Sequence, residues 1–198
     1  LELAARIESF ELAYRMQSAA PDAIDVDREP EHIRKLYGVE EKKCAHFAKQ
    51  CLIARRLVER GVRFVQVTTG GWDTHFDLEK AVRGAAANTD RAAAALITDL
   101  QERGLLDSTL IIWGGEFGRT PTSEGSDGRD HSPYGYSVWM AGGGIKGGTT
   151  YGASDEFSFK AAHNTTMCYD QHATLLHLLC LLPSNFCRQK VLWLSLKD

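Results

Sequence analysis

Arg63-Phe64-Val65-Gln66-Val67 is an apolar, β-branched run that leads into the loop Gly70-Gly71-Trp72-Asp73-Thr74-His75. β-Branched and aromatic residues favour strands, so the run predicts a strand and the loop its exit. A second such run, Thr109-Leu110-Ile111-Ile112-Trp113, follows an alanine-rich helical stretch over residues 78–103. The order strand, helix, strand predicts two parallel strands of an α/β fold, joined by a right-handed crossover.

Three helices are predicted before the first strand, over residues 1–20, 31–37 and 40–60. Pro21 is expected to close the first helix, because proline rarely continues one. Residues 21–30 are acidic and flanked by prolines, so they predict an exposed connection.

The second half of the chain carries weaker signals. A long polar loop over residues 114–135 precedes a third predicted strand over 136–141, and an apolar helix is predicted over 170–182. After residue 182 the pattern degrades and predicts no regular element. We therefore expect one domain over residues 1–182 and a divergent tail over 183–198.

Length and charge narrow the classes of function. The chain has 198 residues and a formal net charge of -3, which gives no electrostatic reason to expect a nucleic acid or an anionic membrane as partner. No apolar run approaches the roughly 18 residues that span a bilayer. The sequence begins with Leu1 inside a helical pattern, so we expect a processed product or a fragment.

Asp73 and His75 lie two residues apart after the first predicted strand. On an extended segment such residues point to the same side, so both could face one metal ion. The alternative is a turn aspartate beside a surface histidine. The other strand-end loops favour the metal, because ligands of α/β sheets bind beyond the carboxyl ends of the strands.

Glu116 and Arg119 follow the second predicted strand. A carboxylate so close to a core is costly unless it is paired or bound to a metal, so Glu116 is a candidate ligand. It could instead form an ion pair with Arg119. The guanidinium of Arg119 is also suited to an anionic substrate oxygen or to a carboxylate.

Asp130 and His131 precede the third predicted strand. Histidine is the commonest metal-binding imidazole, and the adjacent carboxylate could bind the metal or orient the ring. A loop histidine can also be simply solvated. The strand that follows would anchor His131, which favours a functional role.

These motifs together resemble a bacterial family called domain of unknown function 1501. The resemblance covers residues 1 to about 180. The segments that carry it are, in order, Arg55-Arg56-Leu57-Val58-Glu59-Arg60-Gly61-Val62-Arg63-Phe64-Val65-Gln66-Val67, Gly70-Gly71-Trp72-Asp73-Thr74-His75, Ile112-Trp113-Gly114-Gly115-Glu116-Phe117-Gly118-Arg119-Thr120-Pro121, Gly128-Arg129-Asp130-His131, Tyr151-Gly152-Ala153-Ser154-Asp155-Glu156-Phe157 and Asp170-Gln171-His172-Ala173-Thr174-Leu175-Leu176-His177.

That family belongs with the alkaline phosphatase and sulfatase superfamily. The resemblance implies a partial doubly wound α/β/α sandwich of the alkaline-phosphatase-like type. It also implies a metal-dependent hydrolase of phosphate or sulfate esters, with zinc, manganese or calcium as the ion and a small-molecule or polysaccharide ester as substrate. Asp73 and His75 would stand at ligand positions of one metal, Glu116 where an Asp-His pair usually begins, and His131 at a last histidine ligand.

The sequence also departs from the pattern of that family. The family segment with the first metal-binding aspartate and the hydroxyl nucleophile has no counterpart before residue 60, so we expect an incomplete fragment of the hydrolase. The family further implies export, for example to the periplasm. The alternative function is a non-catalytic binding or surface-associated protein that retains the fold, because a fold alone does not confer activity.

Overall fold

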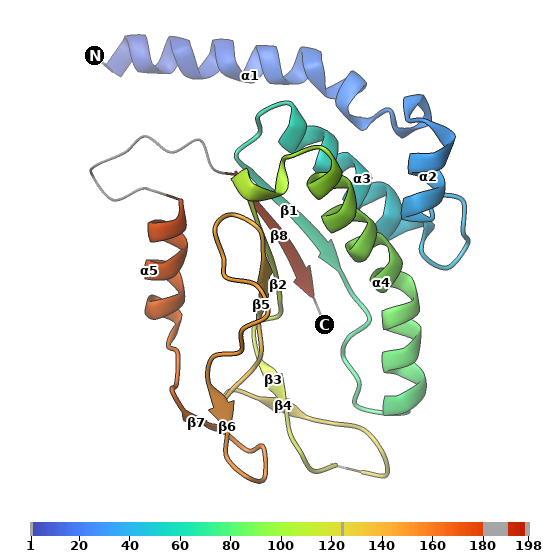
Figure 1. Ribbon diagram of the computed structural model, residues 1–198, viewed down its shortest axis with the longest axis vertical. Coiled ribbons are helices and arrows are strands. Elements are labelled where there is room, and N and C mark those ends of the chain that lie inside the picture. Colours follow the sequence, from blue (N-terminus) through green and yellow to red (C-terminus); the bar gives the residue numbers. More distant parts are fainter. Residues whose placement is uncertain (1, 124, 180–189, 197–198) are drawn as a thin grey trace.

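The computed structural model describes residues 2–123, 125–179 and 190–196. At its centre is a four-stranded sheet in the order β1-β8-β2-β5 (Figure 1). β1 and β2 each pair in parallel with β8, whereas β5 is antiparallel to β2. The predictions of an α/β fold and of parallel first and second strands are therefore confirmed. The strands are β1 (Phe64–Thr69), β8 (Lys190–Leu196), β2 (Thr109–Gly114) and β5 (Trp139–Ala141).

The strand β8 lies between β1 and β2 although it comes from the tail. The expectation that no regular element follows residue 182 is wrong for Lys190–Leu196. Val191, Leu192 and Leu194 are buried. A strand with parallel neighbours on both sides is covered on both faces, so its apolar residues need not alternate with polar ones. Residues 183–189 lie outside the described part of the chain.

Helices cover both faces of the sheet (Figure 1). The helices α3 (Ala45–Glu59) and α4 (Leu78–Glu102) pack on one face, where Leu192 and Leu194 join their apolar side chains in the main core. The helix α5 (Cys168–Leu178) packs on the other face, against a smaller cluster around Leu110 and Ile112. The molecule is thus a mixed α/β structure with a helical layer on each side.

The first helix is longer than predicted. Pro21 was expected to end it, but α1 runs as Glu2–Ile24 and contains that proline. Tertiary contacts extend the helix past Pro21. The guanidinium of Arg56 donates hydrogen bonds to the carbonyl oxygens of Asp22 at 2.6 Å and of Ala23 at 2.9 Å.

The connection after α1 is not simply exposed, as was predicted for residues 21–30. It contains the 3-10 helix η1 (Val26–Arg28) and leads into α2 (Glu31–Tyr37). Glu29 is buried, and its carboxylate accepts hydrogen bonds from Arg55 and Arg56. Those arginines lie on α3, so an ion-pair network fastens the amino-terminal segment to the body of the molecule.

Shorter elements complete the fold. The predicted strand over 136–141 is confirmed in its last three residues, as β5. The segment 114–135, predicted as loop, contains two strands that pair in antiparallel fashion. No helix in the described part of the chain is long and apolar enough to cross a membrane. The remaining elements are η2 (Leu106–Ser108), β3 (Gly118–Arg119), β4 (His131–Ser132), β6 (Ala153–Ser154) and β7 (Ala161–His163).

Candidate metal centre

The loop that leaves β1 presents two of the predicted ligands. Thr74 is buried, whereas its neighbours Asp73 and His75 are partly or largely accessible. This alternation is that of an extended segment, in which residues two apart share a side. Gly71 has a φ of 92°, a conformation that glycine adopts at no steric cost, where the chain turns out of the strand. The predicted pairing of Asp73 and His75 on one side is confirmed.

The strand pair β3–β4 presents another predicted ligand, His131. Arg119 lies opposite His131 in this pair, so both residues belong to one small ribbon. The ribbon continues for one more hydrogen bond, from the Thr120 amide to the Asp130 carbonyl oxygen at 2.9 Å. The Thr120 hydroxyl in turn accepts a hydrogen bond from the Asp130 amide at 3.0 Å. These contacts fix where His131 emerges from the long polar segment.

Backbone contacts hold the two loops together. The Arg129 amide donates to the Thr74 carbonyl oxygen at 2.9 Å. A Cβ atom placed on Gly128 would lie 1.7 Å from the carbonyl oxygen of His75. Only glycine therefore allows the segment before His131 to approach the segment of His75 this closely.

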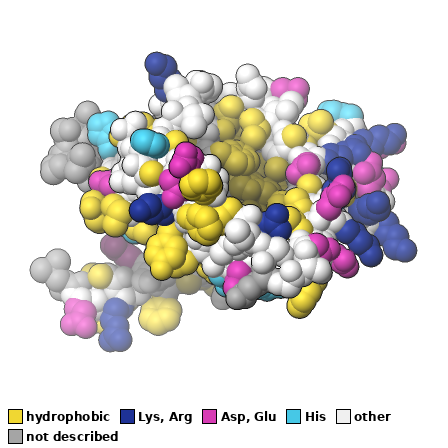
Figure 2. All heavy atoms as spheres, turned by 90° about the horizontal axis from the view of Figure 1, so that it is seen from below, with side chains coloured by type: hydrophobic (Ala, Val, Ile, Leu, Met, Phe, Trp, Pro, Cys, Tyr) yellow, Lys and Arg dark blue, Asp and Glu magenta, His cyan; other side chains and the backbone are white. Residues whose placement is uncertain are grey.

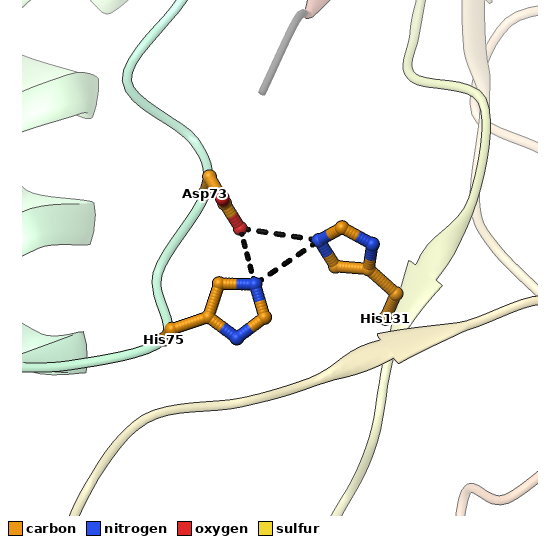
Figure 3. A group of neighbouring side chains, drawn as sticks. All are labelled: Asp73, His75 and His131. Carbon is orange, nitrogen blue, oxygen red and sulfur yellow. Dashed lines mark hydrogen bonds and ion pairs between the residues drawn. The ribbon is translucent and has the colours of Figure 1, made fainter.

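The side chains of Asp73, His75 and His131 converge on one point (Figure 3). Asp73 Oδ1 lies 2.9 Å from His75 Nε2 and 3.2 Å from His131 Nε2, and the two Nε2 atoms are 3.2 Å apart. One ligand atom from each residue thus lies within 4.8 Å of the others. The residues come from sequence positions up to 58 apart, and the group is open to solvent.

Arg119 adds a positive charge to the group. Its Nη1 donates to Asp73 Oδ1 at 2.8 Å, and its Nη2 donates to the Trp72 carbonyl oxygen at 3.1 Å. The hydrogen bond from Arg119 is the main cause that holds the pKa of Asp73 below its ordinary value; His131 and His75 act in the same direction. Asp73 is therefore strongly favoured in the ionised form that a metal requires.

Two further residues support the histidine rings. The Phe117 ring stacks on His131 with 4.1 Å between centroids and 28° between planes. The Asp130 carboxylate lies 3.7 Å from His75 Nδ1, beyond hydrogen-bonding distance, and accepts a hydrogen bond from the His131 amide at 2.9 Å. Asp130 was predicted as a ligand or an orienting group, and both roles stay predictions. No sequence signal pointed to Phe117, because its contact depends on the β3–β4 register.

The structure places Glu116 apart from the group. Glu116 is exposed and follows β2, and it is not among the three residues whose ligand atoms converge. The proposed Glu116–Arg119 ion pair is replaced, in the described part of the chain, by the pair between Arg119 and Asp73. A role for Glu116 as a ligand, and for Arg119 in holding substrate, stays a prediction.

The surface at this end of the molecule combines charge with exposed rings. Figure 2 shows hydrophobic side chains among acidic, basic and histidine side chains on this face, with Lys and Arg gathered toward the side of α2 and α4. Phe76 and Tyr134, close in sequence to His75 and His131, are 75% and 72% exposed. A ligand could therefore reach the group from solvent.

Comparison with known proteins gives one result. The model of a family described as "Protein of unknown function (DUF1501)" matches residues 1–189. No curated protein and no solved structure matches the chain.

Proposed function

The chain belongs to the DUF1501 family, and we propose that it forms part of a metal-dependent hydrolase of phosphate or sulfate esters. One observation carries the proposal: Asp73 Oδ1, His75 Nε2 and His131 Nε2, brought from two loops, lie within 4.8 Å of one another. Three protein ligands that leave a further position open are typical of catalytic zinc sites. The resemblance to the alkaline phosphatase and sulfatase superfamily supplies the reaction class.

The donor set fits a transition metal better than calcium. Ligand atoms of a tetrahedral site with bonds of about 2.0–2.1 Å are separated by about 3.3 Å. The three distances of 2.9, 3.2 and 3.2 Å are close to that spacing. Calcium prefers a shell of oxygen atoms, whereas imidazole suits zinc and related ions. We therefore propose zinc as the ion, with manganese, which prefers oxygen ligands, as the comparison.

The residues around the group have separate tasks in this proposal. Asp73, His75 and His131 would hold the ion through one oxygen and two nitrogen atoms. When bound, a divalent ion supplies Lewis acidity, which stabilises negative charge on ester oxygens. Phe117 keeps the His131 ring in place through stacking, and Arg119 lowers the pKa of Asp73. A guanidinium so close to the site is also suited to an anionic phosphate or sulfate oxygen.

Metal binding is the primary test, because the proposal assigns metal ligands to this chain but no nucleophile. Calorimetric titration with Zn²⁺ and Mn²⁺ should give one ion per chain. Asp73→Asn and His131→Gln should each weaken the affinity by at least about tenfold. The matched control is His32→Gln, an exposed histidine elsewhere on the surface, which should leave the affinity unchanged.

Turnover is tested separately with aryl phosphate and aryl sulfate esters, using the metal-loaded protein and the same variants. Hydrolysis that requires the metal and is lost in His131→Gln supports the proposed reaction. A folded protein that binds no divalent ion would contradict the proposal. It would favour the alternative, a binding or surface-associated protein that retains the fold.

A further inference from the structure

The helix α1 carries an apolar stripe that faces solvent. Leu3, Ile7, Phe10 and Tyr14 are 72%, 51%, 76% and 73% exposed. Every side chain over residues 2–15 is exposed, so this stripe has no cover within the described chain. Side chains of this size are normally buried when they gather on one helix face.

Among the described residues, the contacts that fasten α1 to the molecule lie at its carboxyl-terminal end. Ala23 is buried, and Arg56 on α3 binds the carbonyl oxygens of Asp22 and Ala23. The rest of α1 runs along one edge of the molecule, away from the sheet (Figure 1). The stripe is therefore placed where another helix could pack against it.

The spacing of the stripe is that of a coiled-coil seam. Its members are 4, 3 and 4 residues apart, which places Leu3 and Phe10 at d positions and Ile7 and Tyr14 at a positions of a heptad repeat. Ile7 at a and Leu3 at d favour two-stranded, parallel pairing, whereas the other a and d positions hold the aromatic residues Tyr14 and Phe10.

The charges beside the seam specify the partner and its direction. Arg6 occupies a g position, and Glu11 occupies the e position five residues later. In a parallel pair of identical helices, each g residue faces the e residue five positions along the partner. Arg6 of each copy would then face Glu11 of the other copy, twice by symmetry.

An antiparallel pair would not use these charges. There g faces g and e faces e, and the g positions hold Arg6 and Ala13 while the e positions hold Ala4 and Glu11. No opposite charges can meet in that arrangement. The contact that Glu11 makes within its own helix, with Arg15 at 3.6 Å, is highly exposed and contributes little.

We propose that α1 pairs in parallel with α1 of a second copy of this chain. The seam spans only two heptads, fewer than the three or four that make a stable coiled coil, so the dimer should be weak and concentration-dependent. The pairing is independent of the metal centre, which lies on other elements.

Sedimentation velocity over a range of protein concentrations tests the pairing. Ile7→Gln should raise the dissociation constant of the dimer by at least about tenfold, because it removes a large apolar side chain from the seam in both helices. Leu12→Gln is the matched control, since Leu12 is similarly exposed, at 60%, but lies off the stripe. It should leave the dissociation constant unchanged.

Charge reversal tests the direction. Arg6→Glu and Glu11→Arg should each weaken self-association, because each places like charges across the seam. Mixing the two variants should restore dimers, since every g–e′ pair is then attractive. A wild-type protein that stays monomeric at all concentrations overturns the proposal, as does equal loss in Ile7→Gln and Leu12→Gln, or a mixture that fails to associate.

Discussion

Arg119 Nη1 lies 2.8 Å from Asp73 Oδ1, the same oxygen atom that faces both histidine Nε2 atoms. The guanidinium thus donates a hydrogen bond to the oxygen atom that would also bind a metal ion. Arg119 has two opposite effects on metal binding: it lowers the pKa of Asp73, and it competes with the ion for the oxygen. At neutral pH Asp73 is ionised with or without Arg119, so competition should dominate.

The first prediction follows from this contact. Arg119→Gln should raise the pKa of Asp73 toward its ordinary value of 3.8, since the hydrogen bond from Arg119 is the main cause of its depression. In the wild type, the ionised Asp73 carboxylate contributes to folding stability at every pH above that ordinary pKa. This contribution is lost as the pH falls through the lower pKa of the folded state. Carboxyl NMR titration measures the shift. An unchanged Asp73 pKa in the variant would contradict the assignment.

A second prediction concerns Gly128. Gly128→Ala should displace the loop before His131, because the added Cβ would lie 1.7 Å from the His75 carbonyl oxygen. The zinc affinity should fall by about tenfold or more while the fold is retained, because the displaced side chains lose their common geometry. Gly147→Ala is the control, since nothing lies within 4 Å of its added Cβ. Equal zinc affinities in the two variants would argue against this role for Gly128.

A third prediction concerns β8. Leu192→Ala should lower the free energy of unfolding by about 2–5 kcal/mol, as expected for a leucine removed from a well-packed core. Leu176→Ala on α5 serves as comparison. Leu176 is 45% exposed, so its substitution should lower the free energy of unfolding much less. Urea denaturation measures both. If the two substitutions lowered the free energy of unfolding equally, the result would contradict the position of β8 between β1 and β2.

A fourth prediction concerns the buried ion pairs of α3. Arg55 is 1% exposed and contacts Glu29, Glu59 and Asp99 at 2.6, 2.7 and 2.8 Å. Arg55→Met should cost about 3–5 kcal/mol of stability, because the buried carboxylates of Glu29 and Asp99 each lose one of their cationic partners.

Arg83 provides the control for that substitution. Its pair with Glu79 at 3.0 Å is highly exposed, so Arg83→Met should change the free energy of unfolding by less than about 1 kcal/mol. Thermal and urea unfolding of the two variants measure the difference. Similar losses in both would show that burial of the Arg55 network does not set its energetic importance.

The sequence predicts part of the convergence of these side chains, because the geometry of one loop follows from local rules. Asp73 and His75 share a side since they lie two apart on an extended segment. Two parallel strands place their exit loops at one edge of the sheet, so the approach of the segment after β2 was foreseeable. The partner of Arg119 was not, because the short β3–β4 register brings it to Asp73.

The parts that the sequence did not predict depend on distant contacts. β8 takes its place only through pairing with β1 and β2, and a short apolar run at the end of the chain carries no sign of those partners. Pro21 stays within α1 because Arg56 binds the carbonyls that follow it. The burial of Glu29 also depends on a distant contact, because its partners Arg55 and Arg56 lie 26 and 27 residues further along the chain.

X-ray absorption spectroscopy of the zinc-loaded protein tests the central claim most directly. We expect one zinc ion per chain, with two imidazole nitrogens and one carboxylate oxygen at about 2.0–2.1 Å. In His131→Gln the imidazole contribution should fall to one ring or the zinc should be lost. A shell dominated by sulfur at about 2.3 Å, or a spectrum that His131→Gln leaves unchanged, would contradict a metal centre formed by Asp73, His75 and His131.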